Sequence, residues 1–258
     1  MRVLAAALCL CAGVAHAQQA RVVDIPTRGG VTQRFLYLAA AKPRAAAVLF
    51  SGGAGDLGFA DDGAVVRQKG NFLVRTRELF VARGIAVALV SPPSDRRDLR
   101  GFRQTREHVE DMRSVIAWLR RETGAPVWLI GTSRGTQSAA YVATQLAPAQ
   151  GGADGIVLTS SVLEGRFNDR AVPEMALERI AVPVLVVHHR QDGCRVTAYA
   201  DVPKLMGALK SAPRKELITI DGGVSEGDPC EAFAHHGYNG VERETVDRIA
   251  AWIVGEGR

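Results

Sequence analysis

Aromatic residues are scarce in this sequence, since Phe, Trp and Tyr together make up 6% of its 258 residues. That content is too low to suggest the stacked aromatic side chains on which single-stranded nucleic acids bind. Basic residues outnumber acidic ones by 32 to 27, giving a net charge of +5, but they are scattered among the acids. We therefore interpret them as a solvated surface with a modest basic excess, with no nucleic-acid partner.

Long apolar runs and linkers are also missing. No stretch beyond the amino terminus approaches the roughly 20 residues that span a bilayer, and there is no Pro/Ser-rich linker or internal repeat. Apolar residues make up 47% and charged residues 23%, which excludes a disordered or collagen-like chain. A domain near this length buries about 70–75% of its unfolded surface, so it folds without further cross-links. We expect a single domain.

The amino terminus predicts a secretory signal peptide over residues 1–17. Arg2 gives a positive start, residues 3–14 form an apolar run without a polar face, and residues 15–17 fit a small-x-small cleavage pattern. The apolar run is too short to cross a bilayer. The sequence therefore predicts an exported protein, periplasmic or secreted, whose mature chain spans residues 18–258.

Only four cysteines are present, and two of them, Cys9 and Cys11, lie in the predicted signal peptide. Cys194 and Cys230 remain in the mature chain, where an oxidising compartment favours one disulfide. Such a bond closes a loop of about 36 residues and contributes roughly 3–4 kcal/mol in the chain-entropy model. Two separate buried thiols are the alternative.

Short apolar runs alternate with stretches of helical spacing along the chain. The runs predict strands at residues 46–50, 85–90, 127–130, 155–159, 182–187 and 217–220. Helices are predicted at residues 72–83, 105–123, 136–146, 202–209 and 242–254. Continuous apolar strands are typical of a parallel sheet covered by helices on both faces. Residues 21–39 add one or two leading strands of opposite direction, so we predict one α/β domain with a mostly parallel sheet.

Potentially catalytic side chains follow three of these strands, at the carboxyl ends where functional sites of parallel sheets lie. The first is Gly131-Thr132-Ser133-Arg134-Gly135, a match to G-x-S-x-G between a strand and a helix. Its glycines allow strand and helix to approach closely at a turn that exposes the serine hydroxyl. A plain glycine-rich turn is the alternative. Because a serine hydroxyl is a weak nucleophile, we look for a histidine base held by a carboxylate.

The acid and the base are expected later in the chain, in that order. The strand at 182–187 runs into HHRQD, which places Asp192 in the loop at its carboxyl end. The last strand leads through DGG to CEAFAHHGY, which contains His235 and His236. A histidine there faces the same edge of the sheet as Ser133.

These three stretches resemble the α/β-hydrolase family at its signature sites, and the element order resembles it over nearly the whole mature chain. The resemblance implies a single-domain α/β-hydrolase fold with Ser133 as nucleophile and Asp192 as acid. It favours His236 as base, because family members often place a glycine and an aromatic after the histidine, as Gly237 and Tyr238 stand here.

Alternatives remain for two members of this triad. His235 is the alternative base, and Asp221 or Asp228 is the alternative acid. Cys194 lies two residues after the predicted acid and Cys230 six residues before the predicted base. Their disulfide would tie the two loops together, either to preorganise the triad or as ordinary stapling of loops.

The resemblance also implies an oxyanion hole built from backbone N–H groups. One comes from Arg134, after the nucleophile, and the other from Gly53 or Ala54 in the loop SGGAG after an early strand. Ser51 stands where the family often has a histidine. A phosphate-binding loop is the alternative for these glycines, but neither G-x-x-x-x-G-K nor G-x-G-x-x-G is present.

Two loops are expected to shape the substrate pocket. Residues 162–174 include Phe167, and residues 91–105 carry many charges. An arginine-lined mouth would favour acidic acyl or alcohol groups, but the favoured interpretation is that these charges pair with each other or with solvent. The charged residues of this second loop are Asp95, Arg96, Arg97, Asp98, Arg100 and Arg103.

The sequence therefore predicts an exported serine hydrolase, with a carboxylesterase acting on small-molecule esters as the leading hypothesis. The mechanism needs no cofactor and no metal. Peptidase, lactonase and dienelactone-hydrolase-like activities use the same machinery. A non-catalytic binding or accessory protein on the same fold is the alternative of another class. A metal site is disfavoured, because adjacent strand residues point to opposite faces; its ligands would be His188, His189, Asp192, His235 and His236.

Overall fold

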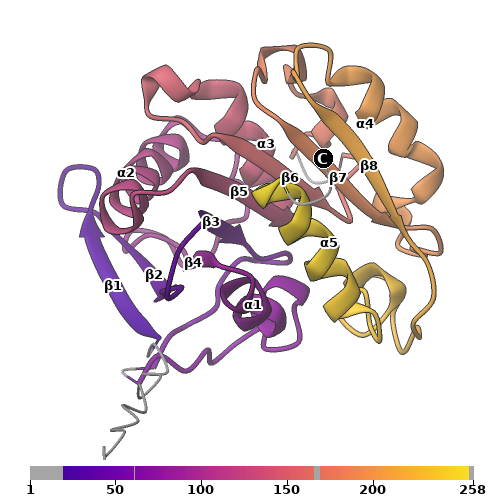
Figure 1. Ribbon diagram of the computed structural model, residues 1–258, viewed down its shortest axis with the longest axis horizontal. Coiled ribbons are helices and arrows are strands. Elements are labelled where there is room, and N and C mark those ends of the chain that lie inside the picture. Colours follow the sequence, from indigo (N-terminus) through magenta and orange to yellow (C-terminus); the bar gives the residue numbers. More distant parts are fainter. Residues whose placement is uncertain (1–19, 61, 166–168, 256–258) are drawn as a thin grey trace, which may run out of the picture.

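The computed structural model describes residues 20–60, 62–165 and 169–255, so the predicted signal peptide and Phe167 lie outside the described residues. Within those ranges an eight-stranded sheet forms the centre, in the order β1-β2-β4-β3-β5-β6-β7-β8 (Figure 1). The strands are β1 (Arg21–Pro26), β2 (Thr32–Leu38), β3 (Ala45–Phe50), β4 (Ile85–Val90), β5 (Val127–Thr132), β6 (Gly155–Thr159), β7 (Val184–His189) and β8 (Lys215–Ile220).

The strand directions place six carboxyl ends at one edge of the sheet. Strands β3 to β8 are all parallel to their neighbours within this group, and β2 is antiparallel to both β1 and β4. The predicted leading strands are therefore both present, and β2 is the one that runs against the rest. The mostly parallel α/β sheet predicted from the apolar runs is confirmed.

Helices cover both faces of the sheet, as continuous apolar strands require (Figure 1). Helices α1 (Phe72–Ala82) and α5 (Glu242–Val254) pack on one face. Helices α2 (Arg106–Thr123), α3 (Gly135–Gln145) and α4 (Val202–Ala208) pack on the other. Every residue of β3 to β7 is buried, so both faces of the central strands contribute to the core.

Two strand boundaries differ from the prediction in a way that matters for the site. Strand β7 begins at Val184, because Pro183 before it has no N–H for a ladder hydrogen bond. It continues through His188 and His189, which pair with β8, so only two residues separate the strand from Asp192. Strand β5 extends to Thr132 and delivers the following residue directly at the sheet edge.

Helix α2 shows how local sequence fixes an element. Thr105 caps its amino terminus by accepting a hydrogen bond from the backbone N–H of His108, and Gly124 ends it in the left-handed conformation. Its apolar face, with Val109 and Met112, packs on the sheet. Of the helices in the described part of the chain, none is both long and apolar enough to cross a membrane.

Candidate active site

Ser133 occupies a sharp turn between β5 and α3. Its φ angle is 52°, in the left-handed region that non-glycine residues rarely adopt. A Cβ added to Gly135 would lie 2.0 Å from the carbonyl oxygen of Phe50, and one on Gly131 would lie 2.4 Å from the carbonyl oxygen of Gly135. Only glycine fits at these two positions, so the close approach expected from G-x-S-x-G is present.

The Asp192 carboxylate and the His236 imidazole are in direct contact across 44 residues of chain. His236 Nδ1 lies 3.0 Å from Asp192 Oδ2. Because a carboxylate only accepts, Nδ1 carries the proton, and the neutral ring is left with Nε2 as its free acceptor. Thr197 Oγ1 donates to the same Oδ2 at 2.9 Å, and the backbone N–H of Cys194 donates to Oδ1 at 2.9 Å. Both carboxylate oxygens are therefore held.

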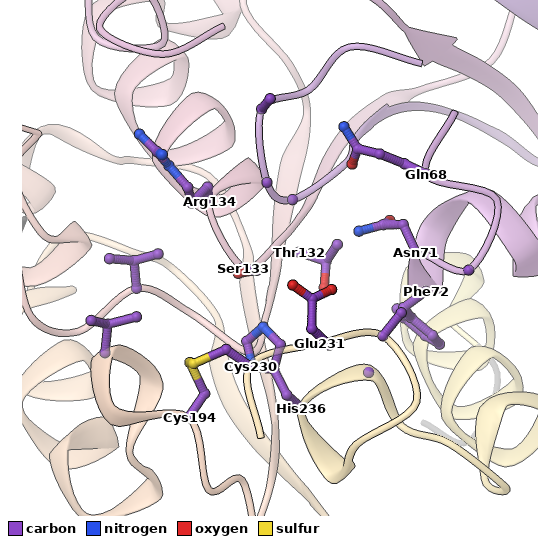
Figure 2. Close-up of a pocket in the computed structure, with 18 of the residues that line it drawn as sticks. Gln68, Asn71, Phe72, Thr132, Ser133, Arg134, Cys194, Cys230, Glu231 and His236 are labelled. Carbon is purple, nitrogen blue, oxygen red and sulfur yellow. A yellow bond between two sulfur atoms is a disulfide. The ribbon is translucent and has the colours of Figure 1, made fainter. Parts of the chain in front are cut away.

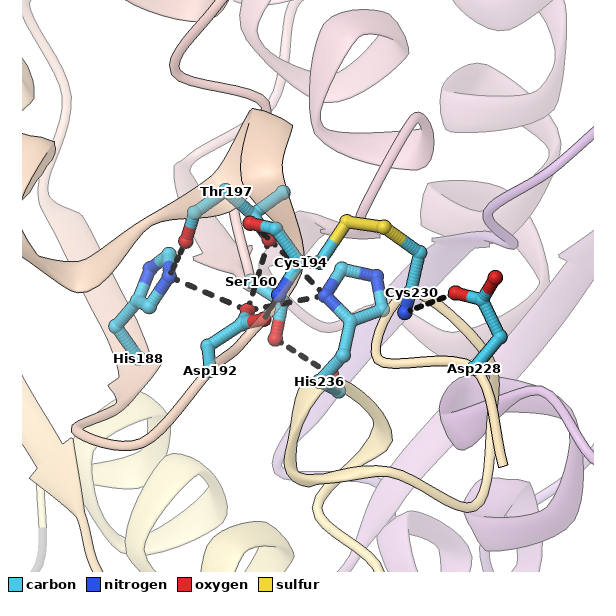
Figure 3. The surroundings of a disulfide bond; sticks show 8 residues. All are labelled: Ser160, His188, Asp192, Cys194, Thr197, Asp228, Cys230 and His236. Atoms are coloured by element: carbon cyan, nitrogen blue, oxygen red, sulfur yellow. Dashed lines mark hydrogen bonds and ion pairs between the residues drawn. A yellow bond between two sulfur atoms is a disulfide. The ribbon is translucent and has the colours of Figure 1, made fainter. Parts of the chain in front are cut away.

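A second histidine lies on the other side of this carboxylate (Figure 3). His188 Nε2 donates to the carbonyl oxygen of Thr197 at 2.6 Å and lies 3.5 Å from Asp192 Oδ2. Burial by itself raises the pKa of Asp192, but its hydrogen bonds with His188 and His236 outweigh that effect and hold the pKa well below the usual range. The group is thus a carboxylate at every pH at which the fold is expected to function.

This low pKa predicts a pH-dependent contribution to stability. A carboxyl whose pKa is lower in the folded chain stabilises the fold fully above its unfolded pKa of about 3.9, and it loses this contribution gradually as the pH falls from there towards its folded pKa. We expect Asp192→Asn to lower the free energy of unfolding by about 1.5–3 kcal/mol at pH 7, and by less at pH 3. Urea unfolding of both proteins at the two pH values measures this, and an equal loss at both would contradict it.

The loop that carries His236 is anchored to the sheet by a buried tyrosine. Tyr238 Oη donates to the carbonyl oxygen of Val187 at 2.8 Å and accepts from the backbone N–H of Ser160 at 3.0 Å. Ser160 Oγ in turn donates to the backbone carbonyl of His236 at 2.8 Å. The ends of β6 and β7 therefore set the position of this histidine.

The alternative triad members have other contacts. The His235 ring stacks on His189, with ring centroids 4.4 Å apart, and the Asp221 carboxylate accepts from Arg190 at 2.8 Å. Asp228 accepts from the backbone N–H of Cys230 at 2.8 Å. Within the described ranges, no group of three or more His, Cys, Asp or Glu side chains is placed to hold a metal ion.

Cys194 and Cys230 form a disulfide, as the sequence predicts (Figure 3). It joins the loop after β7 to the loop that leads to His236. We expect the double variant Cys194→Ala/Cys230→Ala to lose about 3–4 kcal/mol of unfolding free energy, because the bond closes a loop of 36 residues. Urea unfolding without reductant measures the loss. If reductant destabilises the double variant as much as the wild type, the bond is not the cause.

A cavity of about 690 Å³ opens beside Ser133 and His236 (Figure 2). On one side it is bounded by Gly52, Gly53 and Ala54 of the loop after β3; a Cβ on Gly52 would lie 3.0 Å from Ser133 Cβ. Its other lining residues are Gln68, Gly70, Asn71, Phe72, Thr132, Arg134, Gln137, Val162, Glu164, Asp169, Cys194, Val196, Cys230, Glu231, Ala232, Phe233 and Gly237. The expected nucleophile, the expected base and the three expected oxyanion donors thus border one cavity: Ser133, His236, Gly53, Ala54 and Arg134.

The loop at 91–105 does not shape this cavity, contrary to expectation, whereas the loop at 162–174 does. The reason lies in its charges. Asp95 accepts from Arg28 at 3.1 Å, Arg100 lies 3.4 Å from Asp98, and Arg103 is buried, so these charges are engaged away from the cavity. The arginine of the cavity wall is Arg134, and it pairs with Asp169.

Several residues of the site carry no recognisable signal in the sequence. Thr197, which holds the carboxylate, belongs to no motif, and the cavity residues Gln68, Asn71 and Glu231 come from loops without regular spacing. The sequence offers His188 only as a disfavoured metal ligand, and its contact with Asp192 follows from the fold.

Comparison with solved structures identifies the fold. A dienelactone hydrolase from Anabaena variabilis is similar at a TM-score of 0.63 and 14% identity, over 93% of this chain and 97% of that one. An esterase from Pyrococcus furiosus gives 0.66 and 12%, over 91% and 90%. A cold-adapted esterase from an Arctic intertidal metagenomic library gives 0.60 and 19%, over 91% and 94%. The chain therefore has the α/β-hydrolase fold, in one domain. No family model and no curated protein matches its sequence.

Proposed function

We propose that this chain is a serine hydrolase that cleaves small carboxylic esters through Ser133, His236 and Asp192. The observation that carries the proposal is the buried contact between Asp192 and His236, whose ring borders the same cavity as Ser133 on its strained turn. Fold alone does not define activity, but the esterases and the dienelactone hydrolase with this fold support the same chemistry.

The proposed reaction begins with attack of Ser133 Oγ on the ester carbonyl carbon. His236 Nε2 takes the hydroxyl proton and returns it to the leaving alcohol, forming an acyl-enzyme that water then cleaves. Asp192 keeps the proton on Nδ1 and stabilises the imidazolium that forms. Two further donors to the Asp192 carboxylate, the Thr197 hydroxyl and the backbone N–H of Cys194, keep its oxygens in place throughout.

The negative oxygen of the tetrahedral intermediate needs hydrogen-bond donors, on the side of Ser133 opposite the His236 base. We assign this role to the backbone N–H of Arg134, which immediately follows Ser133, and to that of Gly53 or Ala54. Within the described residues these three N–H groups have no backbone acceptor, so they are available to a bound oxygen. Each such donor is typically worth about 3–4 kcal/mol in the transition state.

Export belongs to the same proposal. Residues 1–17 supply the signal-peptide pattern, and the disulfide between Cys194 and Cys230 is typical of oxidising compartments. The enzyme would then act on small esters in the periplasm or outside the cell.

Ester hydrolysis by the purified mature chain tests the function. We expect turnover of short-chain aryl esters, with a δ-lactone and a peptide anilide in the same panel to define the preferred bond. EDTA should leave the rate unchanged, because none of the proposed steps uses a metal. A well-folded chain that cleaves nothing in the panel would point to the non-catalytic alternative.

A further inference from the structure

Arg103 lies behind the loop that follows β3 and bonds to three consecutive carbonyls of that loop. Its Nη2 lies 3.0 Å from the carbonyl oxygen of Ser51, 3.5 Å from that of Gly52 and 3.3 Å from that of Gly53. Its Nη1 donates to Ser138 Oγ on α3 at 3.0 Å. Only 1% of its surface is exposed, although arginine is rarely buried without a functional or structural reason.

The orientation of these carbonyls fixes the orientation of the next N–H groups. In a trans peptide the C=O and the following N–H point in opposite directions, and no cis bond occurs in the described part of the chain. The N–H groups of Gly53 and Ala54 therefore point away from Arg103. Both residues line the cavity and Arg103 does not, so the side opposite the guanidinium is the cavity side.

The next residues of the loop after β3, Ala54 and Gly55, also contact the segment at 99–103. The backbone N–H of Leu99 donates to the carbonyl oxygen of Ala54 at 2.8 Å. A Cβ on Gly55 would lie 2.7 Å from Arg103 Nη2 and 2.7 Å from Leu99 Cδ1, so glycine is required for the guanidinium to reach the loop. The segment at 99–103 thus holds four successive carbonyls, at residues 51–54.

The guanidinium also brings a positive charge to this place, which the carboxylates of Asp169 and Asp98 favour from a distance without a hydrogen bond to it. Among the described residues its hydrogen-bond partners are three carbonyls and one hydroxyl, and none is a carboxylate. Burial, together with the like charge of Arg134, lowers the pKa of Arg103 to about 9, so the group is still protonated at pH 7. A buried cation in a medium of low dielectric favours negative charge nearby.

We propose that Arg103 is a positioning residue for the oxyanion hole: it clamps the carbonyls of residues 51–53 so that the N–H groups of Gly53 and Ala54 face the oxygen that develops at Ser133. This inference rests on the proposed function and goes beyond it. The donors are fixed before substrate binds, so their orientation costs nothing in the transition state.

The test compares Arg103→Met and Arg103→Lys with Arg100→Met, a control on the same segment whose exposed side chain pairs with Asp98. We expect Arg103→Met to lower kcat for a neutral aryl ester about 30–300-fold with KM within about threefold, since one misplaced donor costs about 10²–10³-fold. Binding of a trifluoromethyl ketone, which forms the tetrahedral oxyanion, should weaken by a similar factor. Arg103→Lys should recover part of both losses, and Arg100→Met should change neither.

Hydrogen exchange of the Gly55 amide, whose N–H donates to the carbonyl oxygen of Gly52 at 3.1 Å, gives a readout that needs no turnover. We expect faster exchange in Arg103→Met than in the wild type or Arg100→Met, at unchanged far-UV circular dichroism. If Arg103→Met does not fold, Arg103→Lys carries both measurements, with smaller losses expected. Unchanged exchange, or kcat within threefold of an active wild type, would overturn the inference. An inactive wild type would instead refute the proposed function, and the exchange measurement would still decide the clamp.

Discussion

Replacing Ser133 by alanine is expected to lower kcat/KM for an ester by about 10⁴–10⁶-fold. The substitution removes the only atom that forms the acyl-enzyme, and the residual rate would come from binding and the oxyanion donors. Loss of one hydroxyl at a half-buried position should leave the fold intact, because the turn is held by Gly131 and Gly135. The measurement is the initial rate of hydrolysis of a short-chain aryl ester, with urea unfolding of the same preparation.

Ser161→Ala is the matched control for this variant. Ser161 is buried just beyond the end of β6, and its hydroxyl has no hydrogen-bond partner in the described part of the chain. We expect its kcat/KM to stay within about threefold of the wild type. A Ser133→Ala protein that retains a tenth or more of the wild-type rate would mean that another group is the nucleophile.

Replacing His236 by glutamine is expected to lower kcat/KM by about 10⁵-fold, because the proton of the attacking hydroxyl then has no base to take it. The Asp192 carboxylate keeps its hydrogen bonds from Thr197 and Cys194, so the loop after β7 should hold its conformation. Circular dichroism and the same ester assay measure this prediction.

The neighbouring histidine supplies an internal control. His235 carries the same side chain one residue earlier, but its ring stacks on His189 rather than on the triad. We expect His235→Gln to keep kcat/KM within about threefold of the wild type. If His235→Gln and His236→Gln exchanged their effects, the base would be the other histidine and the contact with Asp192 would be structural.

The fold could be predicted because its signals are local. The apolar runs within β3 to β7 are buried on both faces of the sheet. Polar side chains are therefore disfavoured along them, and the runs can be recognised in the sequence. The glycines of the turn at Ser133 are also a local signal, because the neighbouring backbone leaves no room for a Cβ at either position. The carboxyl end of β7 is not evident from the sequence, because the polar His188 and His189 indicate a loop. In the fold both residues pair with β8 and extend the strand.

The surroundings of the site could be predicted only in part. A pair such as Asp192 and His236 follows from strand order, since both loops meet at one edge of the sheet. The position of Arg103 does not, because a buried arginine and a surface arginine look alike in a charged stretch. What distinguishes it is the three carbonyls that face it, and these belong to a loop about 50 residues earlier in the chain.

Covalent labelling of the folded chain, residues 18–258, with a fluorophosphonate tests the central claim most directly. The reagent requires an activated serine, and trypsin should release residues 122–134, in which Ser133 is the only serine. We predict one adduct per chain on this peptide, formed by folded wild type but not by Ser133→Ala or by denatured protein. No labelling of the folded wild type, or an adduct on a different peptide, would contradict the assignment of Ser133 as the nucleophile.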